Sequence, residues 1–228
     1  MAHQSGLSHR GCVRLVPIFN HLTDNQMDDI MKVVQSETFD KGELVYKAGD
    51  TSDVLTIVNK GSLRIYRLSE SGKEQLVRML KPGEFTGELA LFNETVHEHY
   101  AEAMVKTTVC QIKRSDLQDL LMSYPSISLK VLQALSSRID ETEQQATRFS
   151  TESTEQRLAS YLVDLLPPGK ETDVVELPMN QKNLASYIGT TPETVSRKLK
   201  ELEDMNYIKR LSSKKIRILD EIRLLFLD

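Results

Sequence analysis

The stretch GTTPETVSRKLKELED, residues 189–204, predicts a helix whose two long faces differ in chemistry. Thr191 is suited to cap its start, and Pro192 stands at the first helical position, where a missing N–H leaves no bond unmade. One face is apolar and suited to packing: Val195, Leu199 and Leu202. The other face is polar, with members spaced i, i+3, i+4 and i+7: Glu193, Ser196, Arg197 and Lys200. The sequence therefore raises the question of what this polar face contacts.

A shorter helix is predicted directly before it, in MNQKNLASYIG, residues 179–189. Asn180 is a suitable N-cap for this helix, and Gly189 is a suitable residue to end it. Two helices joined by a short glycine-containing turn are typical of a helix-turn-helix, whose second helix enters the major groove of DNA with its first turns. The alternative is an ordinary amphipathic helix with a solvated charged face, and the pattern alone leaves it open.

The polar face has the donors and acceptors that read base edges. Arg197 can donate two bonds to guanine, Glu193 can accept one from the amino group of cytosine, and Ser196 is small enough to sit against a base edge. Contacts to phosphates, which orient a protein without reading sequence, are expected from Lys182, Thr191, Thr194, Lys198, Lys200 and Lys214. The following segment YIKRLSSKKIRIL, residues 207–219, predicts a strand pair with basic flanks around a turn.

Charge is unevenly distributed along the chain. The net charge of the 228 residues is −4, yet residues 181–217 hold nine Lys and Arg against four Asp and Glu. Such asymmetry indicates that one part of the chain meets an anion, although a solvated charged surface would also explain it.

The bulk composition is that of a soluble protein with one or two domains. Hydrophobic residues make up 39% of the chain, which suffices for packed cores. No apolar run approaches the roughly 20 residues that span a bilayer, and the N-terminus lacks the apolar region of a signal peptide. We therefore expect a cytoplasmic location and no membrane partner. No cofactor and no metal are expected either.

Residues 1–122 predict an antiparallel barrel, roll or sandwich. Six of the ten glycines fall between Gly42 and Gly87, and they separate short runs rich in β-branched residues, Leu and Tyr. These runs are the predicted strands ELVYKA (43–48), VLTIVN (54–59), SLRIYRL (62–68) and EQLVRML (74–80). A short helix from Asp24 to Gln35, with Thr23 as its N-cap, is expected before them.

Residues 126–150 contain no glycine or proline and predict a long helix. A heptad seam runs along it at spacings of 3, 4, 3, 4 and 3: Leu132, Leu135, Ile139, Thr142, Ala146 and Phe149. The seam favours a two-helix dimer contact, and the alternative is a helix packed on its own domain. Thr142 and Ala146 replace the Leu or Ile of a strong seam, so we expect that end to be adjustable. Residues 153–166, STEQRLASYLVDLL, predict a further amphipathic helix.

Four segments resemble the CRP/FNR family of transcription regulators, and the resemblance runs nearly end to end: FDKGELVYKAGD, NKGSLRIYRLSESGKEQL, KPGEFTGELALF and LASYIGTTPETVSRKLKELED. The resemblance implies an α+β protein with three parts. A cyclic-nucleotide-binding-type β-roll, a jelly-roll-like barrel, would occupy residues 1–122. A dimerisation helix would occupy residues 123–150, and a winged helix-turn-helix residues 151–228.

The same resemblance implies a homodimeric regulator of transcription, not an enzyme, with double-stranded DNA and RNA polymerase as partners. The pattern of Glu193, Ser196 and Arg197 resembles the FNR branch, which reads a TTGAT-type half-site. The implied operator is a palindrome with half-site centres about one helical turn apart.

The nucleotide-binding members of the family carry Gly-Glu-Leu followed by Arg-Ser or Arg-Thr. This chain keeps GEL at residues 87–89 but reads HEHYAEA where the arginine is expected, and no arginine lies between Arg78 and Arg114. A buried phosphate without a guanidinium partner is strongly disfavoured. Cyclic AMP is therefore not expected as a ligand, and Glu88 is expected to be a structural remnant. Another small effector in the roll stays open as an alternative.

The two cysteines of the chain are candidates for a redox switch. FNR-branch members hold an iron–sulfur cluster through several N-terminal cysteines and one in a strand of the roll, and this chain has one cysteine in each place, Cys12 and Cys110. Two thiolates cannot supply the four ligands that a cluster needs. What remains resembles the dithiol/disulfide switch inferred for FNR-like regulators of Gram-positive bacteria. Two inert thiols, or a metal site, stay open as alternatives.

A rival of another class is a metal-binding barrel enzyme. His97 and His99 share one face if they lie on a strand, and Glu102 follows at short range. The spacing fits the cupin type of barrel poorly, and no nucleophile–base grouping indicates hydrolysis. A surface loop is the favoured interpretation of this segment.

Overall fold

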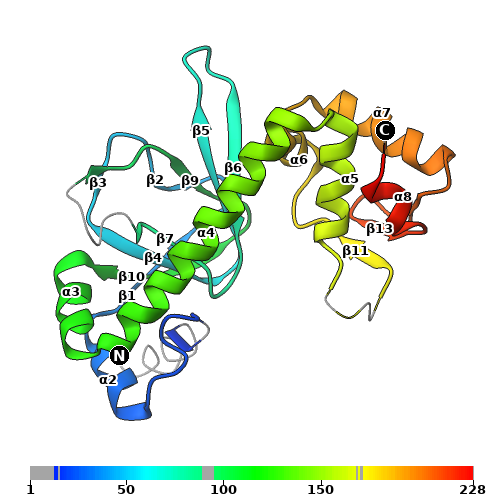
Figure 1. The fold of residues 1–228 in the computed structure, drawn as a ribbon. Coiled ribbons are helices and arrows are strands. Elements are labelled where there is room, and N and C mark those ends of the chain that lie inside the picture. Colours follow the sequence, from blue (N-terminus) through cyan, green and yellow to red (C-terminus); the bar gives the residue numbers. More distant parts are fainter. Residues whose placement is uncertain (1–12, 15, 89–94, 168, 170–171, 228) are drawn as a thin grey trace. The chain divides into compact units, whose positions relative to one another are not determined.

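The computed structural model describes residues 13–227 except 15, 89–94, 168 and 170–171 (Figure 1). The chain divides into two compact units, one of residues 1–72 with 77–139 and one of residues 73–76 with 140–228. The expected α+β class, with a roll, a long helix and a winged helix-turn-helix, is confirmed. None of the described helices is both long and apolar enough to span a membrane.

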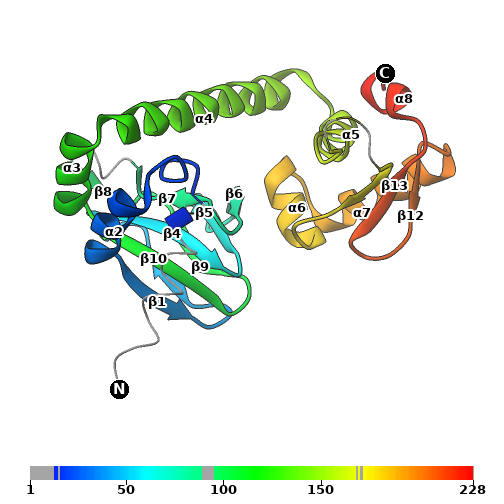
Figure 2. The same cartoon turned by 90° about the horizontal axis from the view of Figure 1, so that it is seen from below.

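Antiparallel strands form the roll of the N-terminal unit (Figure 2). One sheet has the order β1-β10-β4-β7, a second has the order β2-β9-β5-β6, and β3 pairs with β8. Their bounds are β1 Gln35–Phe39, β2 Leu44–Tyr46, β3 Thr51–Ser52, β4 Val54–Lys60, β5 Leu63–Leu68, β6 Glu74–Leu80, β7 Phe85–Thr86, β8 Thr95–Val96, β9 Tyr100–Ala103 and β10 Thr107–Lys113. The four predicted strands correspond to β2, β4, β5 and β6 and are confirmed.

The described residues of this unit form two apolar clusters. One lies within the roll and includes Val58, Leu63 and Ile65. The other joins the first sheet to the segment from Val13 to Leu22 and to the helices of the unit. Burial of apolar surface, at roughly 25 cal/mol per Å², is what holds these helices on the roll.

Helix α2, Asp24–Val33, follows that first segment and confirms the predicted helix before the strands. Its start is held as expected, because the side chain of Gln26 accepts a bond from the backbone N–H of Thr23. The predicted helix extended to Gln35, but α2 ends at Val33, and Gln35 is the first residue of β1. After the roll come α3, Arg114–Ser123, and the long helix α4, Pro125–Thr151.

The C-terminal unit contains four helices and a three-stranded sheet among its described residues. Its elements are α5 Thr154–Asp164, β11 Val174–Glu176, α6 Gln181–Ile188, α7 Pro192–Asp204, β12 Ile208–Arg210, β13 Lys215–Ile218 and α8 Glu221–Leu225. The strands have the order β11-β13-β12, so the predicted hairpin is confirmed and β11 is an additional strand.

Local chemistry explains why α6 and α7 begin and end where they do. The side chain of Asn180 accepts a bond from the N–H of Asn183, and that of Thr191 accepts one from Thr194. Between the helices, Gly189 adopts a left-handed conformation at φ +75°, which a residue with a side chain adopts only with strain.

Candidate DNA-binding interface and sensory residues

The first turns of α7 present an exposed polar face. Glu193, Ser196, Arg197 and Lys200 are all exposed. The opposite face anchors the helix, since Val195, Leu199 and Leu202 are buried. The structure thus brings together the three residues expected to read bases and leaves their side chains accessible.

The charges of Glu193 and Arg197 suit this face of α7 to contact with a polar partner. The pKa of the Glu193 carboxyl lies below its ordinary value, because its own backbone N–H and the Thr191 hydroxyl bond to the carboxylate. Arg197 remains 66% exposed in its side chain and makes only a long contact, 3.7 Å, to Glu201. A guanidinium in this position can exchange that weak surface contact for a base edge at little cost.

The residues expected at phosphates divide into two groups. Lys182, Lys200 and Lys214 are exposed. Thr191 and Thr194 take part in the helix cap, with their hydroxyl oxygens 3.2 Å apart.

Lys198 is more closely held within the chain than the other lysines expected at phosphates, since Lys182 makes only a long contact of 4.0 Å to Glu74. It lies 2.6 Å from Glu155 of α5 and 2.6 Å from Glu201 of α7, and only 23% of its side chain is exposed. These contacts raise the pKa of Lys198, with the bond to Glu155 as the largest cause. The bond to Glu155 could not be expected from the sequence, since Glu155 lies 43 residues away, whereas Glu201 stands three positions along the same helix.

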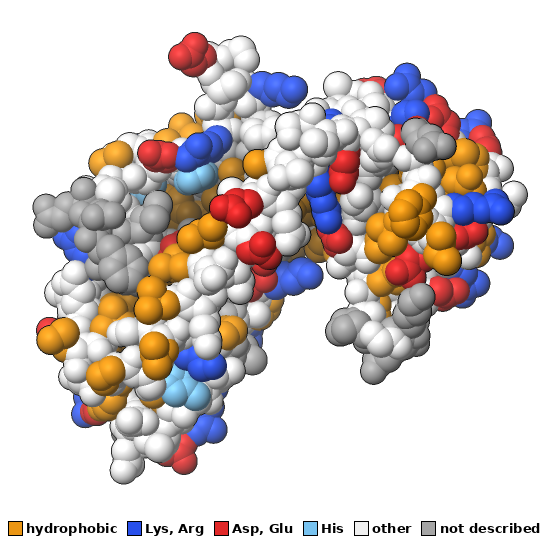
Figure 3. All heavy atoms as spheres, in the orientation of Figure 1, with side chains coloured by type: hydrophobic (Ala, Val, Ile, Leu, Met, Phe, Trp, Pro, Cys, Tyr) orange, Lys and Arg blue, Asp and Glu red, His pale blue; other side chains and the backbone are white. Residues whose placement is uncertain are grey.

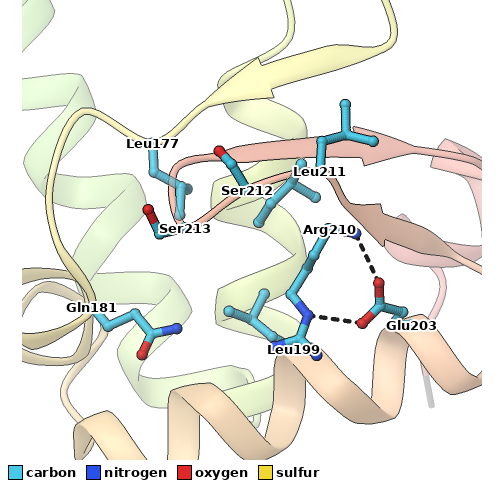
Figure 4. Close-up of a pocket in the computed structure, with 9 residues that line it drawn as sticks. Leu177, Gln181, Leu199, Glu203, Arg210, Leu211, Ser212 and Ser213 are labelled. Atoms are coloured by element: carbon cyan, nitrogen blue, oxygen red, sulfur yellow. Dashed lines mark hydrogen bonds and ion pairs between the residues drawn. The ribbon is translucent and has the colours of Figure 1, made fainter.

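The end of α7 is tied to the β12–β13 hairpin by Glu203 (Figure 4). Its two carboxylate oxygens accept bonds from the backbone N–H of Arg210 at 2.9 Å and from its Nε at 2.8 Å. The backbone bond to Arg210 is the main cause that holds the pKa of Glu203 below its usual range. Beside this pair a surface pocket is lined by Leu177, Gln181, Leu199, Glu203, Arg210, Leu211, Ser212, Ser213 and Ile216.

The long helix α4 carries an exposed apolar row in its N-terminal half. Leu129, Leu132 and Ile139 are 64%, 58% and 60% exposed, and apolar side chains along this helix are visible in Figure 3. Leu129 lies one turn before Leu132 and adds to this exposed row, although it is not a position of the predicted seam. Leu135, in contrast, is partly buried against the core of its own unit.

The later seam positions are more polar or engaged elsewhere. Thr142 and Ala146 are exposed. Phe149 is 39% exposed, and its ring lies against Gly189, where an added Cβ would meet Cε1 at 2.6 Å.

A partly buried polar cluster surrounds Glu88. Arg78 of β6 lies 3.1 Å from Glu88 Oε1, and Arg138 of α4 pairs with the same oxygen. Arg138 also donates a bond of 2.6 Å to the carbonyl of Phe85 and stacks over its ring at 4.3 Å. Burial alone would raise the pKa of the Glu88 carboxyl, but the charges of Arg78 and Arg138 outweigh it, and the pKa lies below its ordinary value. Glu88 is therefore an ion-pair partner that joins the roll to α4, which is a structural role.

Cys110 lies in β10 and is fully buried. Its sulfur is part of a disulfide, and none of the described cysteines is free. The hydroxyl of Ser36 on the paired strand β1 lies 3.6 Å from this sulfur. Cys12, the other cysteine of the chain, lies outside the described residues.

The three residues of the rival metal site do not converge. The His97 ring stacks on Tyr46 at 3.7 Å, and His99 Nε2 accepts a bond from Arg67. Glu102 pairs with Arg64 at 2.6 Å. Among the described residues no group of three or more His, Cys, Asp or Glu is arranged to hold a metal.

Comparison with known protein families gives two matches that follow each other along the chain. Residues 36–124 match the cyclic nucleotide-binding domain, and residues 156–226 match the Crp-like helix-turn-helix domain.

Individual relatives extend over nearly the whole chain. The "Probable transcriptional regulator flp" of Lacticaseibacillus casei is 38% identical over 209 residues, which cover 92% of this chain and 94% of that protein. The transcriptional activator protein Anr of Pseudomonas protegens is 29% identical over 214 residues, covering 92% and 86%. These relatives are regulators of transcription rather than enzymes.

Solved structures share the fold. FixK2 from Bradyrhizobium japonicum matches with a TM-score of 0.73 at 24% identity, over 86% of this chain and 98% of that one. A CooA variant from Carboxydothermus hydrogenoformans matches with a TM-score of 0.74 at 21% identity, over 86% and 88%.

Proposed function

Because the chain belongs to the CRP/FNR family of DNA-binding transcription regulators, we propose that it binds a two-fold symmetric, TTGAT-type operator as a homodimer. In this proposal Glu193, Ser196 and Arg197 contact base edges, and Lys182, Lys200 and Lys214 contact phosphates. Lys198 is left out of the phosphate set, because its ammonium is bound by two carboxylates.

The observation that carries the proposal is the exposed polar face at the start of α7. A helix anchored by three buried apolar residues, with Arg and Glu on its free first turns, has the geometry that the major groove admits. Thr191 and Pro192 hold this end of the helix in place, so its side chains approach DNA from a rigid base.

Dimerisation is proposed along α4. The exposed row of Leu129, Leu132 and Ile139 is an apolar surface that a second α4 can cover. In a two-fold dimer the two α7 helices would meet successive turns of a palindrome. RNA polymerase is the proposed further partner, as for a regulator that acts on transcription.

We propose that the signal is redox state, read by a disulfide between Cys12 and Cys110. A disulfide at Cys110 supports this, because the sequence contains only one other cysteine. In a reducing cytoplasm such a bond would be transient, which suits a switch. It would form by attack of one thiolate on a small-molecule disulfide, followed by attack of the second thiolate on the mixed disulfide. Two thiols would then have been oxidised, and two small thiols released.

The apolar core of the N-terminal unit connects the proposed disulfide to α4. Cys110 belongs to the same apolar cluster as Ile127 and Val131 in the first turns of α4. Val13 and Val16, one and four positions after Cys12 in the sequence, belong to it too. A bond that tethers the N-terminal segment to β10 would therefore bias the packing on which α4 rests.

The DNA-binding part is tested by measuring the affinity of the full-length protein for a TTGAT palindrome and for a scrambled duplex at several salt concentrations. We expect the palindrome to bind about a thousandfold or more tightly than the scrambled DNA. Equal affinities for the two duplexes would disprove the proposed operator class.

The redox part is tested by counting free thiols by mass spectrometry in protein kept reduced and in protein treated with a small-molecule disulfide. We expect two free thiols before treatment and none after, with a changed operator affinity. A Cys110→Ser variant is the matched control, because its affinity should not respond to the oxidant. Oxidation that leaves both thiols free, or leaves the affinity unchanged, would contradict the redox part alone.

A further inference from the structure

Arg157 of α5 binds the ends of two other segments of the C-terminal unit. Its NH1 donates a bond of 2.6 Å to the carbonyl of Glu152, directly after α4. Its Nε donates a bond of 3.0 Å to the carbonyl of Ile188, the last residue of α6. Carbonyls at helix ends lack partners within their own helix, so one charged side chain satisfies acceptors at two helix ends at once.

The contact continues into the turn of the helix-turn-helix. The guanidinium of Arg157 lies over the Phe149 ring at 5.2 Å, and that ring lies against Gly189. Gly189 directly follows the carbonyl that Arg157 binds, and α7 begins three residues later. The end of α4, the start of α5 and the turn before α7 are thus joined through one side chain.

A second arginine shows what this arrangement adds. Arg148 of α4 pairs with Asp164 of α5, so this ion pair joins those two helices. Arg157 extends the link to the end of α6, and so to the turn before the recognition helix, whose body is also tied to α5 by the pair of Lys198 and Glu155. A planar guanidinium with several fixed donors suits this role, whereas a lysine ammonium offers a single point of charge.

We propose that Arg157 is a positioning residue that sets the direction of α7 relative to the end of α4, and so determines which half-site spacing the dimer accepts. This inference rests on the proposed function, since it requires a palindrome read by two copies of α7. The preferred half-site spacing is a sensitive measure of the orientation of α7, because one added base pair moves the two half-sites apart by about 3.4 Å along the duplex. A residue that only stabilised the fold would weaken binding to all spacings alike.

The test compares wild type, Arg157→Ala and Arg157→Lys on palindromes whose central spacers differ by single base pairs. We expect wild type to prefer one spacing and Arg157→Ala to lose about tenfold of that preference, the factor expected for one charge-assisted hydrogen bond. Arg157→Lys should be intermediate, and binding to random DNA should change less than twofold. Arg223→Ala is the matched control, since Arg223 lies near the ring of Tyr207 but is not among the residues that join α4 to α6.

Hydrogen exchange on the same variants gives a second readout that needs no DNA. In Arg157→Ala we expect faster exchange in the turn at residues 189–191 and around residue 152, with the rest of the unit unchanged. Equal losses at every spacing, or an unchanged preference, would overturn the inference while leaving the proposed function standing. Faster exchange throughout the unit would also overturn it. If wild type does not distinguish the palindrome from scrambled DNA, the proposed function fails, and the spacing role of Arg157 fails with it.

Discussion

Replacing Arg138 by alanine should destabilise the N-terminal unit. Arg138 pairs with Glu88, donates to the Phe85 carbonyl and stacks on the Phe85 ring, and the Arg138 and Glu88 side chains are only 22% and 13% exposed. Removing one member of a buried pair costs about 3–5 kcal/mol when nothing replaces it. Because Arg78 stays 3.1 Å from the carboxylate, we expect a smaller loss, about 2–3 kcal/mol.

The loss should depend on pH in a defined direction. The pKa of Glu88 is depressed in the folded chain, so its contribution to stability is present above the unfolded pKa and is lost as pH falls through the folded one. In the Arg138→Ala variant, mainly the charge of Arg78 opposes the effect of burial on Glu88, so the pKa of Glu88 in the folded variant is higher than in the folded wild type. The difference between wild type and variant should therefore narrow as the pH is lowered from 7 toward about 4, because Glu88 becomes protonated at a higher pH in the folded variant than in the folded wild type.

The assay is urea unfolding followed by circular dichroism across that pH range. Arg148→Ala is the control, since it removes another α4 arginine whose partner Asp164 is largely exposed, and it should cost about 0–1 kcal/mol. The reasoning about the Glu88 cluster is refuted if Arg138→Ala lies within about 0.5 kcal/mol of wild type. It is also refuted if the difference is the same at every pH.

Three further predictions concern α4 and the C-terminal unit. Gly189→Ala should lower the unfolding free energy by about 1–2 kcal/mol, since φ is +75° and the new methyl group would lie 2.6 Å from an aromatic carbon. Thermal melting measures this loss, and an unchanged melting temperature would contradict the prediction. Lys214→Ala should reduce the salt slope of DNA binding by about 1, whereas Lys198→Ala should leave it unchanged, and equal slopes for both variants would refute the distinction. Thr142→Leu with Ala146→Leu should strengthen the α4 contact and reduce the response of DNA binding to oxidant, so a full response would exclude this half of α4 from signalling.

The helices around the recognition motif could be predicted because their signals are local. Asn180 and Thr191 cap helices through residues three positions ahead, and Gly189 ends one by its own backbone freedom. Such effects depend on a few neighbours in the chain and are visible in a sequence. The four predicted runs of the roll likewise carry their own β-branched and apolar content.

Features that depend on distant residues could not be predicted. Arg138, which pairs with Glu88, lies 50 positions after it in the sequence. The segment that follows Glu88 lacks the arginine of the Arg-Ser pattern, and nothing in it indicates a distant partner. Lys198 looked free because Glu155 lies in another helix. β1 has almost no apolar pattern of its own, with four of its five residues exposed, and it is a strand because β10 lies beside it. In each case, a residue or strand distant in the sequence determines the local structure or ion pair.

The central claim is that Arg197 of α7 reads a guanine in each half-site. A double-mutant cycle tests it directly, with wild type and Arg197→Ala measured on the TTGAT palindrome and on the same palindrome with that guanine replaced. We predict a coupling of about 1–3 kcal/mol between the side chain and the base, so that each change alone removes most of the effect of both together. Strictly additive losses, or an Arg197→Ala protein that still selects the guanine as strongly as wild type, would contradict the assignment of this face to DNA.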